Sequence, residues 1–226
     1  MNLHAKLALA TALLLAITPA FADTSATMSV TGKILTAPCD ISAVSGFDMT
    51  IDDINLGEVS QDSYNEASFG GTSILSSLTV TCGAPTQVVV KMSDSFSGKK
   101  GADTMPFRGT NLGPANYYAL IDASTGNAIG GYTMKFSSTQ AGISAQDAIL
   151  SADGENGWAV GTNGYLDNGK PYLASAVQGT TTVATTNSAG TLYGFRVYPT
   201  LFKGSDLPTT GNVDISGSAT FEIVSL

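Results

Sequence analysis

Few residues in this chain could carry out chemistry, and their types exclude most forms of catalysis. The sequence has one histidine, His4, so no imidazole beyond that position could act as a general base, activate a nucleophile or bind a metal ion. Carboxylates are more numerous, and a glycosidase that works with two of them is one alternative, but no paired-carboxylate motif stands out. We therefore predict that the protein is not an enzyme and has no catalytic residues and no cofactor.

One short run, Asp-Gly-Glu-Asn-Gly at residues 153–157, contains oxygen ligands of the kind that calcium prefers. Its spacing does not fit the EF-hand loop, so a solvated turn is the better interpretation, and we predict no metal site. The neighbouring Trp158 could contact a sugar from an exposed position. Because large aromatic side chains are mostly buried, we expect it to pack in the core or against a loop.

The two cysteines, Cys39 and Cys82, are the other residues with chemistry of their own. Residues 1–22 have the pattern of a secretory signal, in which Lys6 precedes a mostly apolar run and residues 20–22 read Ala-Phe-Ala, an A-x-A cleavage site. Export would carry both cysteines to a compartment in which disulfides persist. We predict an internal disulfide that stabilises the fold by ~4 kcal/mol. Two buried thiols, or a bond between molecules, are the alternatives.

The bulk composition limits the class of protein and its partners. Hydrophobic residues make up 43% of the chain and charged residues 12%, which is enough apolar material for a core and too little charge for a disordered chain. The net charge of −8 argues against nucleic acid and anionic membrane surfaces, because both attract basic patches. No apolar stretch reaches the ~20 residues that a spanning helix needs, so we do not expect an integral membrane protein.

Alternation of polar and apolar residues, the pattern of a strand with one buried face, dominates the sequence. Strands are expected at residues 27–31, 78–82, 87–92, 117–121, 132–136, 158–160, 172–174, 192–198 and 211–223. Residues 144–150 are interpreted as one or two helical turns with Ser144 as N-cap. Gly57 is expected in a turn rather than a β-bulge, and Lys99 and Lys100 form a pair of loop charges without a function. The pattern predicts an all-β sandwich in one domain.

Four motifs, in this order, resemble those of the pilin family of chaperone–usher pili. They are Met28-x-Val30-x-Gly32-x-Ile34 followed by Cys39, then Ile54-Asn55-Leu56-Gly57-Glu58-Val59, then the strand that ends in Cys82, and finally Gly211-x-Val213 leading to Ala219-Thr220-Phe221-x-Ile223. The resemblance covers residues 23–92 and 192–226. The chain departs from the family at Ser225, where an aromatic residue is frequent, and in a longer domain whose excess lies within residues 137–190.

This resemblance implies an incomplete immunoglobulin-like β-sandwich over residues 37–226, with a groove that an extended segment of another subunit fills by donor-strand complementation. The implied donor is the N-terminal extension, residues 23–36. Its groove-facing residues would be Met28, Val30, Gly32 and Ile34, and those of the C-terminal strand, which would also face the assembly chaperone, would be Val213, Ile215, Phe221 and Ile223.

The function implied by the resemblance is that of a structural subunit of a cell-surface fimbrium, exported through the periplasm, that polymerises by strand exchange and supports adhesion. The implied partners are homologous pilin subunits, a periplasmic chaperone and an outer-membrane usher. A tip or minor subunit that binds a host glycan or an abiotic surface is the alternative, although the pilin-like segment that directly follows the signal favours the polymerising subunit.

Overall fold

The protein is an antiparallel all-β structure, and the described residues contain no α-helix. The computed structural model describes residues 38–45, 55–66, 74–101, 103–141, 144–161, 164–166, 169–208 and 213–226, all within one compact unit, Ala37–Leu226. The strands are β1 (Cys39–Ser45), β2 (Ile74–Cys82), β3 (Thr86–Asp94), β4 (Met105–Phe107), β5 (Thr110–Leu112), β6 (Tyr118–Asp122), β7 (Ala128–Ala141), β8 (Ser144–Ser151), β9 (Ala159–Val160), β10 (Tyr172–Val177), β11 (Thr185–Thr186), β12 (Thr191–Leu201), β13 (Ile215–Ser216) and β14 (Ala219–Ser225). Short 3-10 helices cover Leu56–Glu58, Ser97–Lys99, Pro114–Asn116 and Gly204–Asp206.

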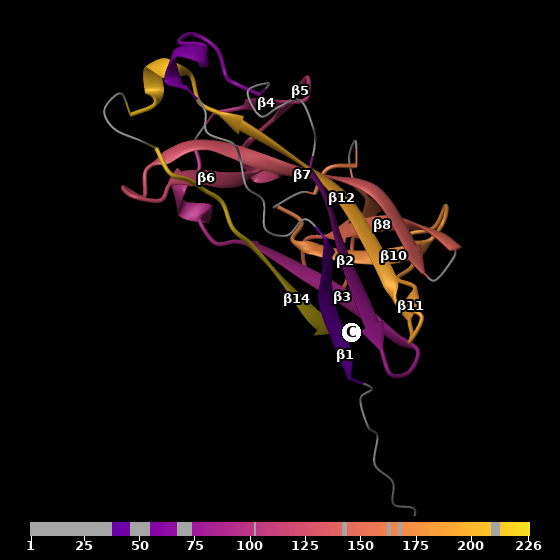
Figure 1. Cartoon of the computed structure of the whole chain (residues 1–226). Helices are drawn as coiled ribbons and strands as arrows, with labels where there is room; N and C mark the ends of the chain where they lie inside the picture. Colours follow the sequence, from indigo (N-terminus) through magenta and orange to yellow (C-terminus); the bar gives the residue numbers. More distant parts are fainter. Residues whose placement is uncertain are drawn as a thin grey trace, which may run out of the picture. The chain divides into compact units, whose positions relative to one another are not determined.

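The strands form two layers around one core, which is the arrangement of a β-sandwich (Figure 1). In the first layer the hydrogen-bonded order is β1-β2-β12-β7-β6-β13, and in the second it is β14-β3-β10-β8-β9, with β11 on the first residues of β3. The long strand β7 connects the layers because it turns tightly into β8, where Gln140 lies opposite Ala145. The hairpin β4–β5 is a separate two-stranded sheet.

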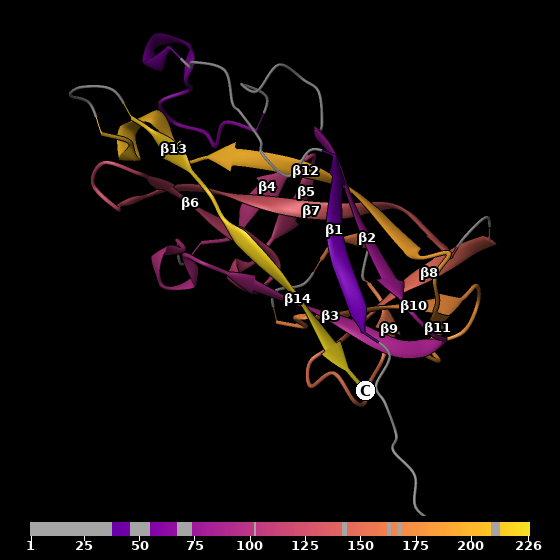
Figure 2. The same cartoon turned by 60° about the horizontal axis from the view of Figure 1, so that its bottom comes forward.

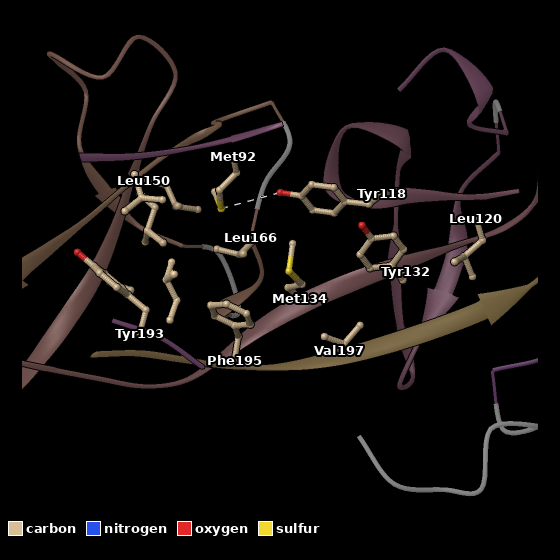
Figure 3. Packing of buried hydrophobic residues seen from close by; sticks show 14 of the residues in the cluster. Met92, Tyr118, Leu120, Tyr132, Met134, Leu150, Leu166, Tyr193, Phe195 and Val197 are labelled. Atoms are coloured by element: carbon tan, nitrogen blue, oxygen red, sulfur yellow. Dashed lines mark hydrogen bonds between the residues drawn. The ribbon is translucent and has the colours of Figure 1, made fainter. Parts of the chain in front are cut away.

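The main core lies between the layers and contains the apolar positions that alternate along the strands. From the first layer, Leu78 and Val80 of β2 and Phe195 of β12 are buried there. Figure 3 shows how Tyr118 of β6 enters this core, with its hydroxyl 4.0 Å from the sulfur of Met92 and its ring stacked on Tyr132. Aromatic pairs of this kind stabilise a core beyond the area that they bury.

Strand β3 has an unbroken apolar run at Val88, Val89 and Val90 because both faces of the strand are buried there. Val88, Val90 and Met92 point into the main core, and Val89 points the other way. On that outer face, which we call the outer face of the sheet, residues of β8 and β10 and of the segment after β10 form a second, smaller outer cluster with Val89. Its buried members are Val89, Ile149, Ala174, Ala176 and Val183, and Trp158 and Tyr172 pack against it. Near-continuous apolar runs are typical of strands covered on both sides.

Two sequence predictions are wrong, and both errors have a physical cause. Residues 144–150 belong to strand β8 and not to helical turns. Ala148 and Leu150 of β8 are buried in the main core and Ile149 in the outer cluster, so the two-residue period of a half-buried strand is not visible.

The segment expected as one strand over residues 211–223 is two strands in different layers. β13 pairs with β6, and β14 pairs with β3. Between them the chain passes close to the core at Gly217, where a Cβ atom would lie 2.7 Å from Cδ2 of Leu120 and 2.9 Å from Cε1 of Tyr132. The alternation of polar and apolar residues continues through this crossing, which is why the pattern concealed it.

The predicted disulfide is confirmed. Cys39 and Cys82 are bonded, with their Cα atoms 4.1 Å apart, and they lie directly opposite each other in the β1–β2 register. The bond therefore attaches the first residue of β1 to the last residue of β2.

We predict that replacing both cysteines by alanine lowers the free energy of unfolding by about 4 kcal/mol, because the closed loop of 43 residues restricts the unfolded chain. Urea unfolding of the oxidised protein and of the Cys39→Ala/Cys82→Ala variant measures this loss. Reduced wild-type protein is the control and should unfold with the variant. Equal midpoints for all three samples would contradict the prediction.

Candidate functional site

Two strands, β1 and β14, border the main core on the same side of the sandwich. Among the described residues each pairs on one side only, β1 with β2 and β14 with β3. Figure 2 shows β1 and β14 at an angle to each other, converging where β1 begins and β14 ends. Their Cα atoms come within 8 Å of each other, yet no strand pairing joins the two. We call this border, with its residues Cys39–Ser45 and Ala219–Ser225, the β1–β14 edge.

The inward-facing side chains at the β1–β14 edge are apolar and only half-buried. Ile41 of β1 and Ala219, Phe221 and Ile223 of β14 pack against the main core without being enclosed by it. The Phe221 ring stacks on the ring of Phe195, with centroids 5.8 Å apart and planes 8° from parallel. The main core therefore reaches the surface along this border.

The outward-facing residues of the same strands alternate with these apolar ones. On β1 they are Asp40 and Ser42, and on β14 they are Thr220, Glu222 and Val224, all exposed. β14 therefore has one face toward solvent and one face toward the core, as a strand that covers a core does. A main-chain edge with an apolar inner face is the feature that an added strand recognises.

The predicted site residues that the structure describes all contact the core, but they fall into two groups. Phe221 and Ile223 lie on β14 at the β1–β14 edge, whereas Val213 and Ile215 pack against the core at the start of the C-terminal segment, where β13 adjoins β6. Only the first group borders the gap between the two strands. Ser225 is the last residue of β14, opposite Val88.

The predicted donor residues Met28, Val30, Gly32 and Ile34 lie outside the described residues. Gly57 lies in the 3-10 helix Leu56–Glu58, where its amide donates to Oδ1 of Asn55 at 3.0 Å, so the turn interpretation is confirmed.

Sequence reasoning missed a buried ion pair between Lys100 and Asp94. The Nζ atom of Lys100 lies 3.5 Å from Oδ2 of Asp94, whose side chain is fully buried. Asp94 also accepts hydrogen bonds from the amides of Phe96, at 2.9 Å, and Ala119, at 3.0 Å. A signal for the buried carboxylate existed in the sequence, because Asp94 continues the inward phase of Val88, Val90 and Met92 along β3.

Aromatic rings surround the cation of this pair. Nζ of Lys100 lies 5.9 Å from the ring centroids of both Tyr117 and Tyr118, and it donates to the carbonyl of Pro114 at 3.2 Å. Burial lowers the pKa of Lys100, and the charge of Asp94 opposes that shift. These contacts attach the loop after β3 to β6, which is a structural role.

Residues 153–157 form the predicted turn, and the carboxylate of Asp153 is its centre. Oδ1 of Asp153 accepts from the amides of Asn156, at 2.7 Å, and Glu155, at 2.9 Å, and from the hydroxyl of Ser151, at 2.9 Å. The hydrogen bond from the Asn156 amide, followed by those from Glu155 and Ser151, lowers the pKa of Asp153 to about 2. Trp158 is half-buried against the outer cluster, as expected, and its indole N–H donates to the carbonyl of Glu155 at 3.2 Å.

No group of three or more metal-ligating side chains gathers anywhere in the described ranges. In the same part of the chain, no helix is long and apolar enough to span a membrane. Comparison of the chain with protein-family models, with curated proteins and with solved structures finds no match in any of the three. The β1–β14 edge is the candidate functional site because the main core reaches the surface there. No similarity to a known protein contributes to this choice.

The low pKa of Asp153 predicts how the turn responds to acid. A folded pKa of about 2, below the unfolded value of ~3.9, means that folding favours the ionised carboxylate. Its contribution to stability is complete above pH ~4 and is lost as the pH falls toward 2. We expect an Asp153→Asn variant to lose stability relative to wild type at pH 6 but not at pH 2, as measured by thermal unfolding across this range. A stability difference that does not change with pH would contradict this assignment.

Proposed function

We propose that this chain is a structural subunit of a chaperone–usher pilus, in which the β1–β14 edge accepts an extended segment of another subunit. The observation that carries the proposal is a main core that reaches the surface between two strands, each of which pairs on one side only among the described residues. A half-buried apolar surface beside a sheet edge favours the addition of a strand, because one segment satisfies both the main-chain groups and the side chains.

The strand order supports an immunoglobulin-like sandwich that lacks one strand. The order β1-β2-β12-β7 corresponds to A-B-E-D of such a domain, and the pair β3–β14 corresponds to C–F. In a complete domain, strand G lies beside F. No described residue takes that place beside β14. A segment added there would cover Ile41, Phe221 and Ile223 on its inner side.

The segment that we propose for this place is residues 23–36 of another copy. Alternation sends Met28, Val30, Gly32 and Ile34 to one face. Burial of the three large side chains at roughly 1.5–3 kcal/mol each contributes about 5–9 kcal/mol before ordering costs, and each ladder hydrogen bond adds ~0.5–1.5 kcal/mol. Gly32 permits a close approach of the two main chains.

The proposed partners follow from this mechanism. Homologous subunits supply and receive the segment, a periplasmic chaperone covers the edge before assembly, and an outer-membrane usher exports the fibre to the cell surface as a fimbrium that supports adhesion. The protein is not an enzyme in this proposal, and it needs no cofactor.

A deletion tests the proposed donor. We expect the variant that lacks residues 23–31 to fold, and to form no multimers that survive detergent without boiling. Purification from the periplasm and gel electrophoresis with and without heating measure this, and circular dichroism verifies the fold.

Two full-length variants test whether the donor segment acts through its apolar side chains and not only through its length. Serine at Met28, Val30 and Ile34 should abolish the ladder of multimers, whereas alanine at Thr27, Ser29 and Thr31 should preserve it. Polymerisation of the deletion variant at the wild-type yield would refute the donor assignment.

A further inference from the structure

The outer face of β14 carries one charge, and it lies in the middle of the strand. Glu222 is exposed between Thr220 and Val224. Its neighbour in the β3 register is Lys91. Nζ of Lys91 lies over the ring of Tyr172, 6.0 Å from the centroid, and Lys100–Asp94 is the one ion pair within 4.0 Å among the described residues. Glu222 therefore has no ion-pair partner in this part of the chain.

Apolar alternation alone leaves the register of an added strand ambiguous. A slip by one residue would turn every apolar side chain outward, so it is strongly disfavoured. A slip by two residues keeps the alternation, and only the small size of Gly32 opposes it, because Met28, Val30 and Ile34 are similar enough in size to exchange places. A charged position that occurs once would add a second determinant of the register.

Residues 23–36 contain a single basic side chain, Lys33, on the face opposite to the apolar positions. In a strand added beside β14, that face shares the outer surface with Glu222. We propose that an ion pair between Lys33 of the donor segment and Glu222 of the accepting subunit fixes the register. This inference rests on the proposed function, because it specifies how the same edge recognises its occupant.

The proposed pair also determines where the neighbouring residues of the donor segment lie. With Lys33 opposite Glu222, Gly32 and Ile34 lie beside Phe221 and Ile223, in one order or the other according to the direction of the strand. Gly32 and Ile34 would then lie beside the half-buried side chains of β14. Across the outer surface, Lys91, Glu222 and Lys33 would alternate in sign over three adjacent strands, and opposite charges in directly facing positions stabilise a sheet.

Charge reversal on both sides tests the pair. A fluorescent peptide of residues 23–36 and its Lys33→Glu version are titrated against dilute monomers of the full-length mature chain and of its Glu222→Lys variant, in which no other copy occupies the edge. Fluorescence anisotropy is the readout. We expect each chain to bind the peptide of opposite charge more tightly, by up to about fivefold, and the preference to shrink at high salt.

Two further variants complete the experiment. Asp62→Lys makes the same change in charge at an exposed position outside the β1–β14 edge, and it should keep the wild-type preference. Glu222→Gln should bind both peptides equally, and it replaces the reversed variant if the latter fails to fold by circular dichroism.

The outcomes distinguish the proposed ion pair from the proposed acceptor edge. Binding of both peptides to every chain with equal affinity would overturn the register pair and leave the acceptor edge intact. Absence of binding by either peptide to any folded chain, at any salt concentration, would overturn the proposed function as well.

Discussion

The fold depends on the burial of apolar side chains between two β-layers, and that burial is incomplete along one border. Along the β1–β14 edge, Ile41, Phe221 and Ile223 contribute to the main core from strands that have no second neighbour among the described residues. Full burial of a large apolar side chain is worth roughly 1.5–3 kcal/mol, so these half-buried positions leave stabilisation that an added strand could supply. In our account this shortfall is the physical basis of assembly.

Both sides of the edge are held firmly by the rest of the molecule. The Cys39–Cys82 disulfide attaches β1 to β2 at the first residue of the strand, and every residue of β14 is in register with β3. The outer cluster, which contains Val89, supports β3 from the face away from the main core. An edge whose two strands are fixed in this way loses little freedom when another strand is added, and such preorganisation favours binding.

The sequence was most informative where one face of a strand is buried and the other is not. The alternation in β2 and β14 and the single pair of cysteines predicted the strands, the sandwich and the disulfide. The alternation of polar and apolar residues did not predict β8, because both faces of that strand are buried. It also could not detect the change of layer at Gly217, since alternation does not record which neighbour a strand pairs with. The charge of Asp94 on an inward position was visible, but its partner Lys100 comes from the loop after β3, and only the folded chain brings the two together.

Hydrogen exchange at the amides of β14 tests the central claim most directly. We predict that the amides of Ala219, Phe221 and Ile223, which point away from β3, exchange rapidly in a dilute monomer. They should become protected when copies of the chain assemble. Strong protection of all β14 amides in a solitary monomer, unchanged on assembly, would show that the edge is already filled by the chain itself and would contradict the account.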